Sequence, residues 1–467
     1  MRKHIPLALL LLVGLALIGC QNETKKAEKA AKAWSSEIES LVTAETAVVI
    51  RVDLASVDFD AAVKPIDEAA QKAGEENLSM SEDFGQAKQK IDDLKKAGAK
   101  TLYMLGSFDD GRPASMLTVW TLNKNADVAA LAELLDTELV QPGKSTPPSD
   151  DDWMASFAYR YTTVAMEHKG LLLLASRAVL DRIAEIKPVA RPELAKAMSA
   201  AGGAPVAVAI IPPKEQVRQA LKDMPPTLPE ELGGGKTDTI RQLEWIALGV
   251  NLPPAMSIAV TVKCESADAA KDIKALIDAT IAAAEEQIQA AIRGSNDGAL
   301  KIMSAAVGLK VFKDFNLQAK GDTITGGLND KQITAAIDNM VPVLVEARAM
   351  AKTAGSAMNL SNMGKSTAIY LASHDEQYPP DIDALLKDGM SPLTLENPRQ
   401  LGAKPDYLYI FPIHGQDKPN AIIAYENYVT WPKHGINYLR ADFSVQICRD
   451  EAEFKKLLDA TNLDDNN

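Results

Sequence analysis

The alternation of hydrophobic and polar positions between residues 44 and 340 follows one pattern twice. Each copy opens with a largely apolar segment typical of a buried strand, at 47–54 in the first copy and at 206–211 in the second. A helix, two strands, a helix, two strands and a last helix then follow in both copies. This order predicts an α+β fold with two tandem α+β repeats, 44–187 and 204–340, whose sheets are mainly antiparallel.

Turn and linker signals support the same division. The last two strands of each copy are joined at a Lys-Gly pair, at 169–170 and at 320–321, where glycine supplies the positive φ of a tight hairpin turn. Residues 188–205 between the copies are rich in Ala, Gly and Pro, which is typical of a linker. We therefore expect two α+β sandwiches that face each other across a pseudo-twofold axis.

A third domain is predicted at 341–467. Pro342 follows the last helix of the second copy, and proline there ends one helix and can begin another. Two registers of apolar and small residues at spacings of three and four predict one long helix from this point to about Ser373. The first register contains Leu344, Ala347, Ala351, Ala354 and Met358, and the second contains Leu360, Met363, Thr367 and Tyr370. We expect the small-residue face around Ala354 and Met358 to pack on an antiparallel sheet.

The N-terminus has the pattern of an export signal. Arg2 and Lys3 precede an apolar run at 7–18, which is shorter than the ~20 residues that a membrane-spanning helix needs. The run ends in Leu-Ile-Gly-Cys at 17–20, which resembles the lipobox of bacterial lipoproteins. The resemblance implies that residues 1–19 are a lipoprotein signal peptide that is removed.

The same resemblance implies that Cys20 is lipidated, with palmitate among its acyl chains, and several acyl chains anchor a protein stably. Gln21 after this cysteine implies the outer membrane, facing the periplasm, if the host has two membranes. Residues 20–43 are expected to form a polar tether and an amphipathic helix, because Trp34 and Ile38 share one helical face. We therefore expect the protein to bind the membrane, as its partner, through the N-terminal lipid.

From Ala347 onward the chain resembles the globular heads of type II secretion pseudopilins and the pseudopilin-like domains derived from them. The matching segments are Asn359-Leu360, Gly364, Tyr370, Tyr378-Pro379-Pro380, 406–410, 422–426 and the closing hairpin from His434 to Phe443. Phe443 stands where the family usually has glycine, and the family's cleaved leader and apolar helix are replaced by an internal polar helix. The resemblance covers about 100 of the 467 residues. It implies a long helix on an antiparallel sheet.

One cluster of side chains could bind a metal. His374, Asp375 and Glu376 stand where the long helix is expected to end, with Asp381 and Asp383 close by, and they offer imidazole and carboxylate ligands. The alternative is a solvated helix end at which histidine is favoured by the helix dipole. Major pseudopilins bind calcium in a loop, but that loop has no residue-by-residue match here. Both interpretations stay open, and we weight the metal site as the weaker.

Composition excludes several classes of function. The 50 Lys and Arg against 63 Asp and Glu give a net charge of −13, so the electrostatic footprint of a nucleic-acid-binding protein is missing. Aromatic residues make up only 5% of the chain, which weakens the case for a surface on which bases stack. Cys264 and Cys448 are the cysteines that remain beside the lipidated one, and whether they pair is left open. Stability must therefore come from packed cores.

Catalytic motifs are missing from the sequence. It contains no Gly-x-Ser-x-Gly elbow, no His-Glu-x-x-His helix and no dinucleotide fingerprint. We therefore expect no enzyme and no cofactor, but a lipid-anchored cell-envelope protein that acts as a non-catalytic binding or scaffolding module. One alternative is an accessory component of a type II secretion or pilus-like machine, with an envelope protein as partner. A hydrolase with an unrecognised site is another.

Overall fold

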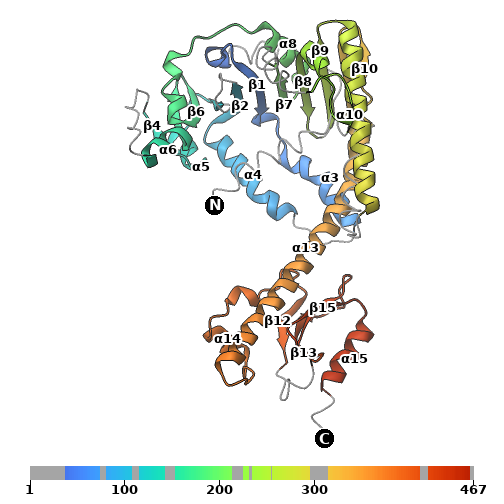
Figure 1. The fold of residues 1–467 in the computed structure, drawn as a ribbon. Helices are drawn as coiled ribbons and strands as arrows, with labels where there is room; N and C mark the ends of the chain where they lie inside the picture. Colours follow the sequence, from blue (N-terminus) through green and yellow to red (C-terminus); the bar gives the residue numbers. More distant parts are fainter. Residues whose placement is uncertain are drawn as a thin grey trace. The chain divides into compact units, whose positions relative to one another are not determined.

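The computed structural model describes residues 37–73, 80–107, 115–141, 153–212, 225–230, 234–253, 255–294, 314–410 and 419–462 (Figure 1). The lipobox, Cys20, Trp34 and most of the predicted amphipathic helix lie outside these residues. The chain divides into two compact units, Met1–Pro342 and Val343–Asn467, and each is described by itself. Both units mix helices with antiparallel sheets, which confirms the predicted α+β class.

The N-terminal unit is built on one sheet of eleven described strands, in the order β10-β11-β9-β8-β7-β1-β2-β3-β6-β5-β4. The strands are β1 (Thr46–Asp53), β2 (Ala99–Ser107), β3 (Ser115–Leu122), β4 (Leu139–Val140), β5 (Thr163–His168), β6 (Leu171–Ser176), β7 (Val206–Ile210), β8 (Leu243–Asn251), β9 (Ser257–Cys264), β10 (Gln318–Lys320) and β11 (Thr323–Asn329). Neighbouring strands are antiparallel except β4 and β5, which are parallel.

The expectation of two separate sandwiches is wrong. β1 and β7 pair antiparallel from Val48–Ile210 to Val52–Val206, so the two predicted copies share one sheet. Without this pairing, each copy would expose the backbone groups of its opening strand along a sheet edge. Outward from the β1–β7 pair, one half runs β1-β2-β3-β6-β5 and the other runs β7-β8-β9-β11-β10.

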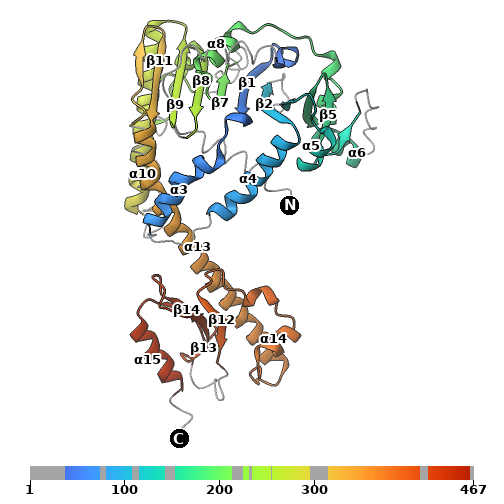
Figure 2. The ribbon, with the colours of Figure 1, turned by 180° about the vertical axis from the view of Figure 1, so that it is seen from behind.

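Helices cover both faces of this sheet (Figures 1 and 2). They are η1 (Glu39–Leu41), η2 (Leu54–Ser56), α3 (Phe59–Lys72), α4 (Met80–Lys96), α5 (Val128–Leu134), α6 (Trp153–Tyr161), α7 (Arg177–Leu180), η3 (Ile183–Glu185), α8 (Pro192–Ala200), η5 (Thr237–Gln242) and α10 (Ala267–Gly294). Asp58 and Asp127 cap α3 and α5, because each carboxylate accepts a hydrogen bond from a first-turn backbone N–H. Both views show α10 beside the sheet edge formed by β10 and β11.

The predicted linker at 188–205 contains a packed helix instead. In α8, Leu194 and Ala197 are fully buried, and the helix lies against β7 and β8. Pro192 occupies the first turn, where its fixed φ favours a helix, and alanine is the best helix former. The composition that suggested a flexible connection therefore also suits a short helix.

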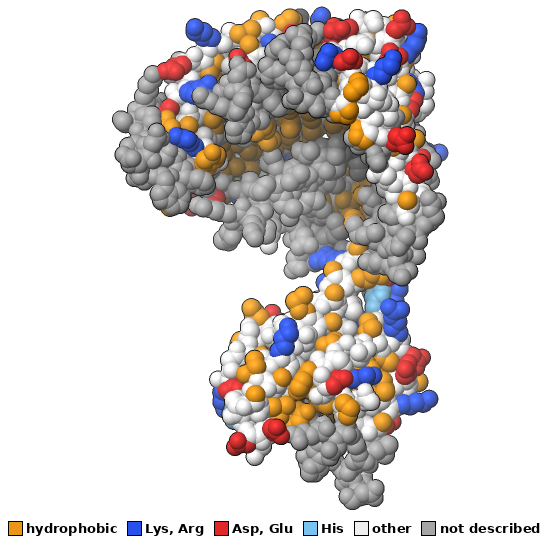
Figure 3. All heavy atoms as spheres, in the orientation of Figure 1, with side chains coloured by type: hydrophobic (Ala, Val, Ile, Leu, Met, Phe, Trp, Pro, Cys, Tyr) orange, Lys and Arg blue, Asp and Glu red, His pale blue; other side chains and the backbone are white. Residues whose placement is uncertain are grey.

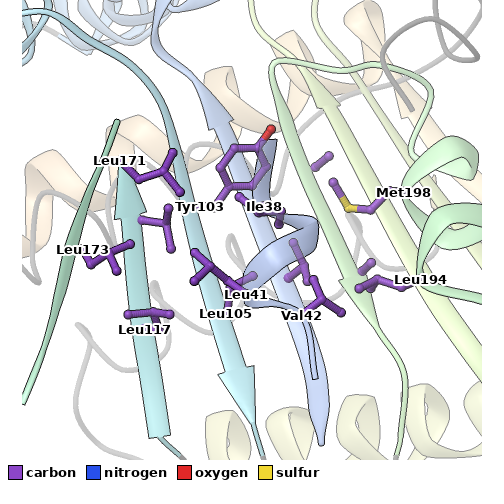
Figure 4. Close-up of a cluster of buried hydrophobic side chains, with 14 of the residues drawn as sticks. Ile38, Leu41, Val42, Tyr103, Leu105, Leu117, Leu171, Leu173, Leu194 and Met198 are labelled. Carbon is purple, nitrogen blue, oxygen red and sulfur yellow. The ribbon is translucent and has the colours of Figure 1, made fainter. Parts of the chain in front are cut away.

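The largest core cluster lies on the face of the sheet that α8 covers (Figure 4). Ile38 and Leu41 from the N-terminal turn pack there with Tyr103 of β2 and with Leu194 and Met198 of α8. Side chains alternate along each strand, so the neighbours of these residues point to the opposite face. A second cluster on that face is covered by α4 and α5, and a third by α10.

The C-terminal unit packs a long helix on a four-stranded antiparallel sheet. The helix α13 (Asp330–Ser373) ends where predicted, and the strands β12 (Gly402–Tyr409), β13 (Ile422–Tyr428), β14 (Ile436–Arg440) and β15 (Val445–Cys448) follow in order. The smaller helices are α14 (Ile382–Lys387), η6 (Pro392–Leu395) and α15 (Glu451–Asn462). We expected a break at Pro342, but α13 runs through it, because a proline removes one helical hydrogen bond and can bend a helix without ending it.

The expectation that the small-residue face of α13, from the first register, packs on the sheet is wrong, whereas Leu360, Met363 and Thr367 of the second register are buried. Ala351 and Ala354 are exposed, and Met358 is 64% exposed. The sheet instead meets a face that contains Ser356, Leu360, Met363 and Thr367, all of which are buried. The two buried hydroxyls on this face have hydrogen-bond partners. The Ser356 hydroxyl lies 2.9 Å from that of Tyr407, and the Thr367 hydroxyl lies 3.2 Å from that of Tyr409.

Candidate functional site: an apolar strip on the sheet

Two rows of apolar side chains cross the middle of the eleven-stranded sheet, on the face opposite the largest core cluster. We call them together the apolar strip. The first row contains Met104, Ile50, Val208, Leu248 and Val260, which are direct cross-strand neighbours on β2, β1, β7, β8 and β9. The second row contains Val48, Ile210 and Ile246, on β1, β7 and β8. The strip therefore spans five strands and both halves of the sheet.

All eight side chains of the strip are half-buried. The adjacent row on the same face is different: Leu102, Val52, Val206, Val250 and Ile258 are each at most 5% exposed. The strip rows and the adjacent row lie on the same face, because residues of the opposite face alternate with them along each strand. Their positions in the strands are therefore equivalent. The difference in exposure therefore comes from the elements that cover the face.

Helices flank the strip. The helix α4 packs near β2 on one side, and α10 packs near β9, β10 and β11 on the other. Ile50, Met104 and Leu248 border the cluster under α4 and α5, while Ile246 and Val260 border the cluster under α10. Figure 3 shows hydrophobic side chains inside a hollow of this unit.

The chemistry of the strip suits apolar contact. Neither row contains a titratable or hydrogen-bonding side chain. The five strands are central in the sheet, so each has neighbours on both sides with which its backbone groups pair. The strip can therefore bind a ligand through hydrophobic burial, but it offers no general acid, base or nucleophile.

The N-terminal turn is fixed to the opposite face of the sheet by polar contacts. The Tyr103 hydroxyl donates to Glu37 at 2.7 Å, and burial, reinforced by this hydrogen bond, raises the pKa of Tyr103 far above its ordinary value. One guanidinium nitrogen of Arg191 donates to the carbonyl oxygens of Thr43, Ala44 and Thr46. Residues 38–42, at the start of the described chain, are thus an integral part of the core.

The C-terminal unit contains a buried ion pair. Glu426 on β13 is fully buried, and one of its carboxylate oxygens lies 2.6 Å from a guanidinium nitrogen of Arg399, whose side chain is 6% exposed. The Asn437 backbone N–H donates to the same oxygen at 2.6 Å, and its side-chain amide donates to the Thr353 carbonyl of α13 at 2.8 Å. The network therefore joins the loop before β12, two strands and the long helix.

The candidate metal ligands are used for local structure at the end of α13. The His374 ring stacks on Tyr370 with centroids 3.8 Å apart, and its Nδ1 lies 3.0 Å from the Tyr370 carbonyl oxygen. Asp375 and Glu376 have φ of 51° and 60°, and the Glu376 N–H donates to the Leu371 carbonyl, as in a helix C-cap. Within the described residues, no three His, Cys, Asp or Glu side chains are placed to hold a metal ion.

The two cysteines of the described chain are free and buried. Burial, with the Asp322 carboxylate nearby, raises the pKa of Cys264 to about 11. A thiol with so high a pKa is a poor nucleophile at neutral pH.

Sequence reasoning missed the apolar strip. Residues 47–50 and 206–211 in the opening runs are apolar on both faces, and such strands lie in the middle of a sheet. That signal favours pairing between the two runs, but each was expected to belong to a sheet of its own. The strip follows only from their pairing.

Comparisons with protein-family models, with curated proteins and with solved structures found no match for this chain. In the ranges that the structure describes, no helix combines the length and the apolar character needed to cross a bilayer.

Proposed function

We propose that this protein is a lipid-anchored component of the cell envelope and acts as a non-catalytic binding module. The observation that carries the proposal is the apolar strip, which leaves eight neighbouring apolar side chains half-buried in the middle of a sheet. Contiguous apolar surface of this kind is typical of binding sites, whereas scattered apolar residues are ordinary. The lipid at Cys20 would hold this surface at the membrane, at the outer membrane facing the periplasm where a host has two membranes.

The same proposal includes the origin of the two units. Tandem duplication of an α+β repeat is supported by the matching strand orders β1-β2-β3-β6-β5 and β7-β8-β9-β11-β10. A pseudopilin-like origin of the C-terminal unit is supported by its long helix on a four-stranded antiparallel sheet. Phe443 has a φ of 63°, so this residue takes the backbone conformation that glycine supplies in the family.

An apolar dye that fluoresces on leaving water, such as anilinonaphthalene sulfonate, tests the binding role. The mature chain should bind it, and replacing Ile50 and Val208 together by Thr should weaken binding at least tenfold. Thr is β-branched and suits a strand, so the sheet should be kept. The matched control is Ile447→Thr at a 41%-exposed position on β15, which should bind as the unchanged protein does. Equal binding by the strip variant and the control would contradict the proposal.

A second candidate is an accessory role in a type II secretion or pilus-like machine. It is favoured by the outward face of α13, on which Ala351, Ala354 and Met358 are exposed. A photocrosslinking residue at position 358 should then capture secretion components in intact cells, and Ile447, in the same unit, is the control position. Capture of the same proteins from both positions would count against this role.

A further inference from the structure

We infer that the ligand of the apolar strip is a single acyl chain, lying across the strands from β2 to β9. This inference rests on the proposed binding role and names the class of ligand. It follows from three properties of the strip: its chemistry, its backbone and its dimensions.

The chemistry of the strip selects a hydrocarbon. Its eight side chains come from Val, Ile, Leu and Met, and they provide no donor or acceptor to a ligand. A ligand that placed polar groups on this surface would lose their hydrogen bonds to water without replacement, at a cost for each group. An acyl chain has no such groups along its length, so only its head group needs to stay in water.

The backbone of the strip argues against a peptide. A bound peptide strand usually gains its affinity by pairing with the free edge of a sheet. The strands β2, β1, β7, β8 and β9 have neighbours on both sides, so none of them offers an edge. A peptide lying flat on the strip would leave its own N–H and C=O groups desolvated and unpaired.

The dimensions of the strip match one chain. The first row crosses four strand spacings of about 4.8 Å, which gives a length of about 19 Å. One leaflet of a bilayer, with a depth of about 15 Å, is the length scale of an extended acyl chain. The two rows lie two residues apart along the strands, or about 6.6 Å, so the strip is wide enough for one chain and too narrow for two or three side by side.

The strip also crosses the β1–β7 pair. Ile50 and Val208 face each other at this pair, and Met104 and Leu248 follow as the next neighbours on either side. A chain that lies across the pair contacts both halves of the sheet. We therefore expect one acyl chain for each protein, and a loss of affinity when either Ile50 or Val208 is replaced.

The experiment uses the mature chain with Cys20→Ser and a fluorescent fatty acid as the probe. Without the proposed lipid at residue 20 the protein needs no detergent, which would otherwise compete with the fatty acid for the strip. Palmitate should displace the probe with one site per chain. Ile50→Thr and Val208→Thr should each weaken palmitate binding at least tenfold, and Ile447→Thr should leave it unchanged. Palmitate carrying a diazirine should label the peptides that contain Met104 and Leu248 in the chain with no strip substitution, a readout that does not depend on how the variants fold.

Each outcome decides between the two proposals. If the apolar dye binds at the strip but palmitate neither competes nor labels, the acyl-chain inference is wrong and the binding role stands. The same holds if an apolar peptide displaces the probe and palmitate does not. If the strip variants change the binding of neither the dye nor palmitate, both proposals are wrong. Labelling confined to peptides outside β1, β2, β7, β8 and β9 would also overturn the inference.

Discussion

Replacing Arg399 by Met should destabilise the C-terminal unit strongly, because it leaves the Glu426 carboxylate buried without its counterion. Met fills much of the volume of the arginine stem but carries no charge, so the change isolates the electrostatic effect. Glu426 is fully buried, and its oxygens would keep hydrogen bonds from Asn437 and Asn397.

The magnitude follows from the burial of both partners. Removing one member of a buried ion pair costs about 3–5 kcal/mol, whereas an exposed pair contributes about 0–1 kcal/mol. With Arg399 6% exposed and Glu426 fully buried, we expect the free energy of unfolding of this unit to fall by about 3–5 kcal/mol. Lys404→Met is the matched control, because Lys404 is 82% exposed in its pair with Asp406, and its effect should stay below about 1 kcal/mol.

Hydrogen exchange of peptides from β13 and β14, followed by mass spectrometry, measures this stability separately from that of the N-terminal unit. The double variant Arg399→Met with Glu426→Leu should lose less than the sum of the two single variants, since it leaves no unpaired charge. A loss below about 1 kcal/mol for Arg399→Met, or the same loss for Lys404→Met, would refute the reasoning.

Three further predictions concern other parts of the chain. Cys20→Ser should abolish palmitate labelling and move the protein from the detergent phase to the aqueous phase; continued membrane partition would show that the anchor lies elsewhere. Gly364→Leu should destabilise the C-terminal unit by about 1–3 kcal/mol in denaturant unfolding, because a Cβ at this position would lie 3.0 Å from a Leu439 methyl, whereas Ala354→Trp at an exposed position should change stability by less than about 0.5 kcal/mol. A larger loss of stability for Ala354→Trp than for Gly364→Leu would mean that α13 buries the face of Ala354 and not the face of Gly364. Cys264, whose pKa is raised to about 11, stays protonated when folded while the unfolded thiol ionises near its ordinary value, so its contribution to stability should be lost as pH rises from about 9 to about 11. Native Cys264 should also resist iodoacetamide at pH 8.5, and labelling as fast as in the unfolded chain would contradict its burial.

Local patterns were enough to predict much of the architecture. The hydrophobic runs predicted the opening strands of both copies, and the spacing of apolar residues predicted that the long helix ends at Ser373. These features depend on residues close together in sequence, so the periodicity of a single segment reveals them.

The features that the sequence did not reveal depend on pairing between distant segments. β1 meets β7 across more than 150 residues, and only that contact creates the apolar strip. The first half of the buried face of α13 was mispredicted because Ser356 looks like a solvent-facing residue until Tyr407 supplies a partner for its hydroxyl. The ion pair of Arg399 with Glu426 likewise joins a loop to a strand, and charged residues are rarely buried without such a partner.

We propose the apolar strip as the binding surface of this protein. The most direct test is to purify the protein from its own cell envelope and to measure non-covalently bound lipid by mass spectrometry, for the unchanged chain and for Ile50→Thr with Val208→Thr. We expect about one acyl-chain ligand per unchanged protein and at least a tenfold lower amount in the variant, with Ile447→Thr unaffected. Equal amounts in all three proteins, or no bound lipid in any of them, would contradict it.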